Sequence, residues 1–216
     1  LGEYSALACV GSIKFEDTLK ILKKRGEFMQ EAVPSGEGAM LAVLGVASKE
    51  LDKILEINNK KYECFIANDN SNLQVVVSGL KKDINLLSDD LNDKKIKNLK
   101  LNVSAPFHCK YMKTASDKMT NYINDLKMND LEKPIISNVT ASETSSSKEI
   151  KSLLISQIEK KVRWLESVEY MINNGVKNFV EIGPGKVLSG LIKRINKNVN
   201  VNSINSEEDI KLLIND

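Results

Sequence analysis

Between residues 39 and 103 the chain alternates short apolar runs with amphipathic stretches, and this order constrains the fold more than any other feature. Four runs have the length and composition of β-strands, and two stretches carry apolar residues at helical spacing. In order they are strand 39–44, a helix capped by Ser48, strand 63–67, strand 74–78, helix 81–91 and strand 96–103. The polar residues 68–72 between the second and third strands are expected to form a loop. A β-α-β-β-α-β order is the ferredoxin-like split unit, so the sequence predicts such a subdomain over residues 39–103.

The segments on either side of this unit also alternate helices with strands. Ahead of it we expect helices over residues 3–10 and 15–32, the second with Phe15, Leu19, Leu22 and Met29 at helical spacing. After it we expect, in order, helix 110–125, strand 135–139, a connection over 140–147, helices 148–159 and 165–173, strand 179–182, helix 187–195, strand 199–204 and helix 207–214. Strands separated by helices are typical of a parallel α/β sheet. We therefore assign residues 1–38 and 104–216 to a larger α/β subdomain, into which residues 39–103 are inserted.

Charge and hydropathy exclude two classes of partner. The chain carries 31 basic and 29 acidic residues, for a net charge of +2, whereas a nucleic-acid-binding domain normally has a basic surplus. An RNA-recognition module shares the β-α-β-β-α-β order, but strand 74–78 has no aromatic residue on which a base could stack. No apolar run approaches the ~18 residues of a membrane span. We therefore expect neither nucleic acid nor membrane as a partner.

The chain contains one histidine, His108, and three cysteines, Cys9, Cys64 and Cys109. One histidine excludes a metal site built from several histidines, and cysteines without C-x-x-C spacing indicate reduced thiols. His108 directly follows a predicted strand, where α/β proteins often place reactive groups. An isolated histidine is more often a surface or structural residue, so its position leaves open both that interpretation and a role as general base.

Arg25 is one of only three arginines in a chain with 28 lysines. A lysine would serve most surface positions equally well, whereas a guanidinium can bind a carboxylate through two hydrogen bonds. Arg25 is therefore a candidate carboxylate ligand, with an ordinary surface arginine as the other interpretation. Residues 183–186 (Gly-Pro-Gly-Lys) lack the glycine that a Walker A motif requires at position 180, so we expect a tight turn into a helix there.

Six segments along the chain resemble those of one enzyme family. They are residues 1–7 (LGEYSAL), 25–32 (RGEFMQEA), 68–74 followed by Val-Val-Val-Ser-Gly, 105–108 (APFH), 168–171 (VEYM) and 181–188 (EIGPGKVL). Together and in this order they resemble the malonyl-CoA:acyl carrier protein transacylases, the acyltransferases of type II fatty acid synthesis. The resemblance implies an α/β-hydrolase-like large subdomain with an inserted ferredoxin-like small subdomain. It also implies that a malonyl group passes from malonyl-CoA to the phosphopantetheine thiol of acyl carrier protein through a covalent acyl-serine, with no cofactor and no metal.

The resemblance also implies roles for individual residues. His108 is the base that deprotonates the serine and later the thiol, and the backbone carbonyl of Gln157 orients its Nδ1–H. The backbone N–H of Leu1 is one donor of the oxyanion hole. The implied substrate-binding residues are Arg25, which pairs with the malonyl carboxylate, and Met29, Phe107, Asn70 and Gln74.

The chain departs from the family pattern in two places. The Gly-His-Ser stretch that ends in the nucleophile and an upstream Gly-Gln-Gly segment are not among the 216 residues. We expect the serine to precede Leu1 directly, so that this chain is the larger part of an enzyme. The alternatives are a catalytically inactive scaffold that binds carrier protein and a polyketide-type acyltransferase. Asn72 and Leu73 replace the usual Pro-Gly, which weakens the assignment of Asn70 and Gln74.

Composition also bears on where the protein works. The excess of lysine and asparagine is typical of an AT-rich genome. We expect a monomer in a bacterial-type cytoplasm or in an organelle stroma, such as the plastid (apicoplast) of a protist.

Overall fold

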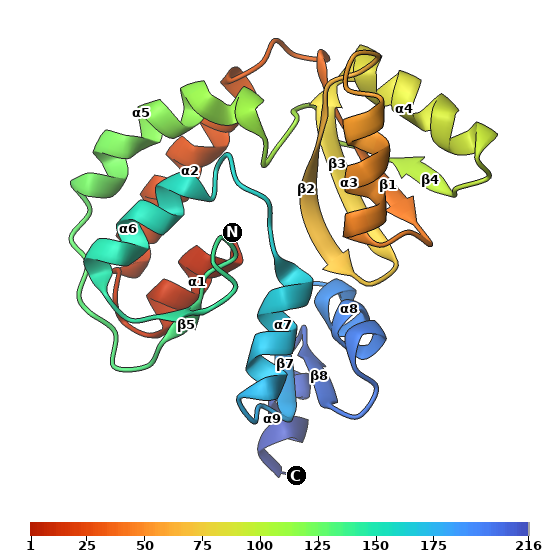
Figure 1. Ribbon diagram of the computed structural model, residues 1–216. Helices are drawn as coiled ribbons and strands as arrows, with labels where there is room; N and C mark the ends of the chain where they lie inside the picture. Colours follow the sequence, from red (N-terminus) through yellow and green to blue (C-terminus); the bar gives the residue numbers. More distant parts are fainter. Residues whose placement is uncertain (216) are drawn as a thin grey trace. The chain divides into compact units, whose positions relative to one another are not determined.

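The computed structural model describes the backbone of residues 1–215 and the side chains of residues 1–212. It divides into two compact units, residues 1–164 and residues 165–216 (Figure 1). Among the described residues, no helix has the length and apolar character needed to cross a membrane.

A four-stranded antiparallel sheet with two helices forms one part of the first unit. The strands are β1 (Gly38–Leu44), β2 (Cys64–Ser71), β3 (Gln74–Leu80) and β4 (Asn98–Lys100), and the helices are α3 (Ser48–Ile57) and α4 (Lys81–Asp93). The spatial order β2-β3-β1-β4 puts the two ends of the unit, β1 and β4, side by side. This arrangement confirms the β-α-β-β-α-β order expected from the sequence, while the boundaries of the two subdomains stay a prediction.

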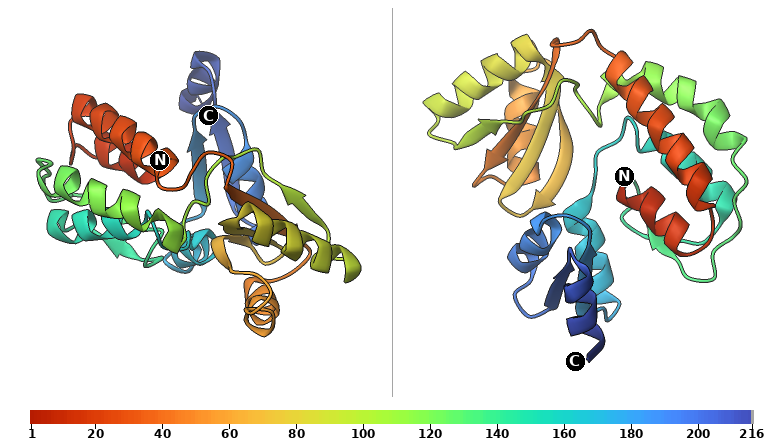
Figure 2. Two further views of the ribbon diagram at one scale, coloured as in Figure 1. Left: turned by 90° about the horizontal axis from the view of Figure 1, so that it is seen from above. Right: turned by 180° about the vertical axis from the view of Figure 1, so that it is seen from behind.

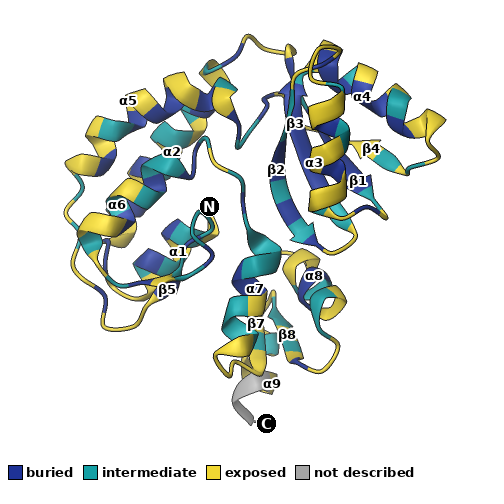
Figure 3. Ribbon diagram, viewed as in Figure 1, coloured by how far each residue is buried: buried dark blue, intermediate teal, exposed yellow. Residues whose placement is uncertain are grey.

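The two faces of this sheet have different surroundings. On one face, alternate residues of β1 and β3 pack against α3 and α4, forming a core of Leu41, Val43, Val75, Val77, Leu51, Leu55, Ile84, Leu87 and Leu91. The other face carries a smaller apolar cluster of Met40, Ala42, Ala67 and Val76, against which Leu101 and Phe107 pack. Figure 3 shows β3 buried along nearly its whole length. The second face therefore receives the chain segment that leads to His108.

The expectation of a loop over residues 68–72 is wrong. β2 continues to Ser71, and only Asn72 and Leu73 form the turn to β3. These polar residues adopt a strand conformation because their backbone is hydrogen-bonded on both sides. On one side β2 pairs with β3, with two bulges. On the other side Val162 N–H donates to the Ala67 carbonyl at 2.8 Å, and the Val162 carbonyl accepts from Asp69 N–H at 2.9 Å.

Two other expectations for this sheet need smaller corrections. β4 covers only Asn98–Lys100 instead of residues 96–103. Ser48 is the first helical residue of α3, and Ala47 occupies the N-cap position without a side-chain hydrogen bond.

The rest of the first unit is a layer of helices. It contains α1 (Gly2–Cys9), α2 (Phe15–Glu31), a short 3-10 turn η1 (Lys110–Met112), α5 (Lys113–Asn124) and α6 (Ser147–Ser156), with the short strands β5 (Ile135–Ile136) and β6 (Glu143–Thr144). Helices α2 and α5 lie side by side in both views of Figure 2. The core shared by α1, α2, η1, α5 and α6 includes Tyr4, Leu7, Ile21, Met29, Met112, Met119, Ile123, Ile150 and Leu154. The connection expected over residues 140–147 instead contains β6 and ends with Ser146 as the N-cap of α6.

The apolar stripe expected on α2 is partly wrong. Phe15 and Leu19 are exposed, at 66% and 53% of their surface, while Thr18, Ile21 and Met29 face the core. The buried face is rotated by about one residue position from the expected one. A helix with few apolar residues offers two neighbouring stripes, and only the position of the partner helix α5 decides which one is buried.

The second unit, residues 165–216, is a small α/β arrangement. It contains most of α7 (Trp164–Asn173), then β7 (Asn178–Ile182), α8 (Val187–Ile195), β8 (Asn200–Ile204) and α9 (Glu207–Asn215). β7 and β8 pair in parallel, which confirms the parallel pairing expected for strands separated by a helix. The Gly-Pro-Gly stretch is the expected tight turn, with positive φ angles of 131° at Gly183 and 95° at Gly185. Glu181 caps α8 by accepting hydrogen bonds from Leu188 N–H at 3.0 Å and Ser189 N–H at 2.7 Å.

Candidate active site

His108 lies in the loop between β4 and η1. Its ring is hydrogen-bonded to Gln157, the residue that follows α6. The ring Nδ1 lies 2.9 Å from the backbone carbonyl oxygen of Gln157. Because a carbonyl oxygen only accepts, Nδ1 carries the proton and donates, and Nε2 is left without a proton. The His108 backbone has a φ of 59°, in the left-handed region, which costs a residue with a side chain about 1–3 kcal/mol. Strain of this size at a polar loop residue is a feature of functional sites.

The environment of His108 keeps its imidazole neutral at pH 7. Burial, with the positive charge of Arg25 as a smaller cause, lowers the pKa of His108 to about 4, while the hydrogen bond to the Gln157 carbonyl opposes this shift. The ring therefore has a free lone pair on Nε2 over the physiological pH range. That is the protonation state that a general base requires.

Arg25 lies on α2 and points its guanidinium toward the same glutamine. Its Nη2 donates to the Gln157 side-chain Oε1 at 2.8 Å. Its Nε is buried and has no hydrogen-bond partner. Burial lowers the pKa of Arg25, and Tyr4 and Glu3 partly offset this effect. A buried guanidinium with an unused donor is suited to bind an anion that enters the site.

Gln157 is the residue that joins the base and the guanidinium. It follows α6 directly and is only 5% exposed. Its backbone carbonyl accepts from the His108 ring and its side-chain oxygen accepts from Arg25, so both contacts come from one residue. The structure thus brings together three predicted site residues that are 132 and 49 positions apart in sequence.

Leu1 lies at the start of α1, where it is the N-cap residue. Its carbonyl accepts from Tyr4 N–H at 3.0 Å and from Ser5 N–H at 3.2 Å. Its nitrogen therefore belongs to the positive end of a helix, which favours a developing negative charge.

The other predicted substrate-binding residues occupy different surroundings. Met29 is 3% exposed and packs in the helical core, one turn after Arg25 on α2. Phe107 is partly buried and packs against both the helical core and the second face of the sheet. Asn70 and Gln74 lie at the hairpin end of β2 and β3. Roles in substrate binding for these four residues stay predictions.

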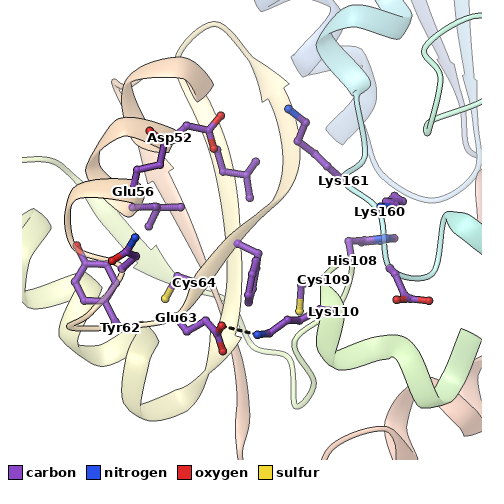
Figure 4. A pocket seen from close by; sticks show the side chains of 15 residues that line it. Asp52, Glu56, Tyr62, Glu63, Cys64, His108, Cys109, Lys110, Lys160 and Lys161 are labelled. Carbon is purple, nitrogen blue, oxygen red and sulfur yellow. Dashed lines mark hydrogen bonds and ion pairs between the residues drawn. The ribbon is translucent and has the colours of Figure 1, made fainter.

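A cavity of about 550 Å³ opens beside His108 within the first unit (Figure 4). Cys109 and three lysines, Lys110, Lys160 and Lys161, line it together with residues of α3 and β2. Lys110 forms an ion pair with Glu63, the residue before β2, shown by the dashed line in Figure 4. The cavity thus gives an extended group access toward the His108 loop.

Two of the three thiols are unreactive, and the described residues form no metal cluster. Burial raises the pKa of Cys64 to about 12 and that of Cys109 to about 11, so both thiols stay protonated and are poor nucleophiles at pH 7. None of the three cysteines forms a disulfide bond. The described side chains contain no group of three or more that could hold a metal ion.

Sequence reasoning missed two residues next to the His108 loop, Gly38 of β1 and Ser78 of β3. Ser78 is fully buried and its hydroxyl donates to the Phe107 carbonyl. A serine at the end of the run Val-Val-Val is the signal that could have found it, because a buried hydroxyl needs a partner.

A neutral histidine beside a buried arginine suits acyl transfer, and the comparisons with known proteins show that this chain is an acyltransferase domain. A family model described as acyl transferase domain matches residues 1–211. The malonyl CoA-acyl carrier protein transacylase of Bacillus subtilis (strain 168) is 42% identical over 219 residues, covering 99% of this chain and 68% of that protein. The Staphylococcus aureus (strain MRSA252) protein of the same name is 42% identical over 217 residues, with 98% and 69% covered.

Solved structures similar to this chain belong to the same family. An acyl-carrier-protein-S-malonyltransferase from Bartonella henselae matches with a TM-score of 0.95 and 38% identity, over 99% of this chain and 68% of that one. A malonyl-transacylase in complex with a type II PKS acyl-carrier protein matches with a TM-score of 0.93 and 35% identity, over 99% and 70%. The chain belongs to the malonyl CoA-acyl carrier protein transacylase family and spans about two thirds of the length of these relatives. The predicted family and fold class are therefore confirmed.

Proposed function

We propose that this protein transfers a malonyl group from malonyl-CoA to the phosphopantetheine thiol of acyl carrier protein. The observation that carries the proposal is the double contact of Gln157, whose carbonyl orients the His108 ring and whose side chain holds Arg25. A base and a carboxylate ligand are thereby fixed to one buried residue. Malonyl thioesters have the two groups that such a site needs, a reactive carbonyl and a free carboxylate. The names of the relatives support the same substrates.

In the first half-reaction the nucleophile is a serine that we place directly before Leu1. Neutral His108 takes the serine proton on Nε2, and the serine Oγ attacks the thioester carbonyl of malonyl-CoA. The oxyanion of the tetrahedral intermediate accepts a hydrogen bond from Leu1 N–H at the positive end of α1. The intermediate collapses, the carbon–sulfur bond breaks, and the CoA thiolate takes the proton from His108. The product is a malonyl ester of the serine.

The second half-reaction reverses these steps with a different thiol. His108 Nε2 takes the proton of the phosphopantetheine thiol, and the thiolate attacks the serine ester. The serine oxygen leaves with the proton held by His108, so the base returns to its neutral state. A ring whose pKa is lowered to about 4 releases that proton readily. The Gln157 carbonyl keeps Nδ1 protonated in both half-reactions and so keeps Nε2 available.

Arg25 accounts for a preference for malonyl over acetyl groups. The malonyl carboxylate would pair with a guanidinium whose Nε is buried and has no partner. An acetyl group has no carboxylate and would leave that charge unpaired, at a cost on the order of 3–5 kcal/mol. Lysine is a poor replacement because it lacks the planar pair of donors.

The direct test uses the protein expressed from its complete reading frame and radiolabelled malonyl-CoA. We expect a covalent malonyl label on the serine before Leu1 and its transfer to holo acyl carrier protein. His108→Ala should slow the transfer by at least ~10². A folded protein that acquires no label would contradict the proposal and favour a carrier-protein-binding scaffold instead.

The role of Arg25 has its own measurement. Arg25→Ala should lower kcat/KM for malonyl-CoA by about 10² or more while leaving kcat/KM for acetyl-CoA unchanged or raised. The exposed Lys20, in the first half of α2, supplies a matched control, because Lys20→Ala removes a positive charge from the same helix whose ion-pair partner is Asp17. Equal losses with both thioesters would show that Arg25 does not bind the carboxylate.

Two finer assignments belong to the same proposal. The structural relative that binds a polyketide carrier protein keeps a polyketide-type role as the second candidate. Transfer rates to fatty-acid and polyketide carrier proteins would separate the two, and we expect the fatty-acid carrier protein to be preferred. The named relatives from Bacillus and Staphylococcus are bacterial, so we place the protein in a bacterial-type cytoplasm, with an organelle stroma as the alternative. Detection of the native protein in an organelle fraction would overturn that placement.

A further inference from the structure

The loop that carries His108 rests on the second face of the four-stranded sheet. That face is apolar, with Met40 of β1 and Val76 of β3 in its cluster, and the Phe107 side chain packs against it. Ser78 lies two residues after Val76 and pairs with Met40 across the β1–β3 ladder, so it belongs to the same face. Ser78 is 0% exposed. It therefore places one polar group on an apolar surface, directly under the loop.

The Ser78 hydroxyl donates a hydrogen bond to the backbone carbonyl oxygen of Phe107. That carbonyl belongs to the peptide group between Phe107 and His108. Rotation of this peptide plane is what sets φ of His108, which has the strained value of 59°. The hydrogen bond thus acts on the dihedral angle that determines where the His108 side chain points.

Gly38 of β1 supports the same loop from the neighbouring strand. A Cβ at this position would clash with Pro106 Cδ and would lie 2.7 Å from Pro106 N and 3.0 Å from Ala105 Cα. The loop is therefore seated directly on the backbone of the sheet. A further hydrogen bond of 3.0 Å joins Cys109 Sγ to the Pro106 carbonyl. These contacts keep the loop rigid around the Phe107–His108 peptide.

We propose that Ser78 is a positioning residue for His108. Two anchors fix the imidazole, one on its backbone through Ser78 and one on its ring through the Gln157 carbonyl. Without the Ser78 hydroxyl, the Phe107–His108 peptide can rotate toward the favourable negative-φ region. The Cβ of His108 then swings, and the Nδ1 contact to Gln157 is lost. A misplacement of about 1 Å in a catalytic group can slow a reaction by up to about 10².

This inference rests on the proposed function for its kinetic consequence, so the test combines kinetics with a spectroscopic measurement. The three variants are Ser78→Ala, which removes the hydroxyl, Ser78→Thr, which keeps it, and Val76→Ala, which weakens the same face without touching the hydrogen bond. Each is made in the protein from its complete reading frame. For Ser78→Ala we expect kcat to fall about tenfold while KM for malonyl-CoA stays within about twofold. Ser78→Thr should restore most of kcat, and Val76→Ala should lower the Tm without lowering kcat.

The spectroscopic measurement is the tautomer of His108, read from ¹⁵N chemical shifts of the ring and assigned by its loss in His108→Gln. The wild type should show the Nδ1–H tautomer, and Ser78→Ala should show a mixture of both tautomers. A pure Nδ1–H tautomer together with an unchanged kcat in Ser78→Ala would overturn the inference, as would an equal loss of kcat in Val76→Ala. If the wild type transfers no malonyl group, the proposed function fails, while the tautomer comparison still decides whether Ser78 positions His108.

Discussion

The lowered pKa of His108 predicts how the stability of the protein depends on pH. The folded protein binds a proton on His108 only near pH 4, whereas an unfolded chain binds one near the ordinary value of 6.5. Between these two values the unfolded state is protonated and the folded state is not. The free energy of unfolding therefore falls as the pH drops from about 6.5 to about 4, and His108 contributes no change above about 7.

The size of this effect follows from the two pKa values. A drop from 6.5 to about 4 corresponds to about 3 kcal/mol, at 1.36 kcal/mol for each pH unit. The ring is only partly buried, so solvent reduces this value, and we expect about 1–3 kcal/mol. Burial disfavours the protonated ring in the folded state and gives the effect its sign, and the charge of Arg25 acts in the same direction.

Urea unfolding of the wild type and of His108→Gln at about pH 7 and about pH 4.5 measures the effect. Carboxylates titrate in the same range, but they do so in both proteins, so the difference between the two losses isolates His108. The wild type should lose about 1–3 kcal/mol more than His108→Gln on acidification. Equal losses would mean that the folded ring takes up its proton at an ordinary pKa, and the argument for a base kept neutral by its surroundings would fail.

Three further variants test the packing and the site. Gly38→Ala should lower the free energy of unfolding by about 1–3 kcal/mol because its Cβ meets Pro106. Gly26→Ala lies on the exposed side of α2, where a Cβ meets nothing within 4 Å, and should raise the free energy of unfolding by about 0.5–1 kcal/mol. Thermal unfolding measures both glycine variants. A Gly38→Ala protein as stable as the wild type would show that the Pro106 loop does not pack closely on β1. Gln157→Glu should pair its new carboxylate with Arg25 and raise KM for malonyl-CoA at least about tenfold, with the His108 tautomer unchanged because the backbone carbonyl remains. An unchanged KM would show that the Gln157 side chain does not govern Arg25.

The small subdomain could be predicted from the sequence because the residue pattern within each helix and strand indicates its secondary structure. Leu51 and Leu55 on α3, or Val75 and Val77 on β3, follow the period of the element that buries them. The polar end of β2 could not be predicted in this way. Its strand conformation depends on pairing with Val162, almost a hundred residues away, which leaves no trace in the side chains.

The site also has residues that the sequence pattern could reveal and residues that it could not. His108 could be singled out because it is the only histidine, and Arg25 because arginine is rare in this chain. The partner of His108 is a backbone carbonyl, which every residue has, so no residue pattern alone selects Gln157 for it. The link between Gln157 and Arg25 and the support from Ser78 depend on tertiary packing. Only the resemblance to a known family placed Gln157 beside His108 before the structure did.

The joint position of Arg25 and Gln157 explains why a neutral carbonyl, and not a carboxylate, orients this base. A carboxylate in place of the Gln157 carbonyl would add a negative charge beside the His108 ring and raise its pKa. With the carbonyl, burial and the charge of Arg25 both lower the His108 pKa in the free protein. A malonyl carboxylate bound to Arg25 cancels the second of these effects, so His108 becomes a stronger base when the correct acyl group is present. Saturating malonate should therefore raise the His108 pKa in an NMR titration of the wild type and leave it unchanged in Arg25→Ala; a pKa that does not move in the wild type would separate the base from the guanidinium.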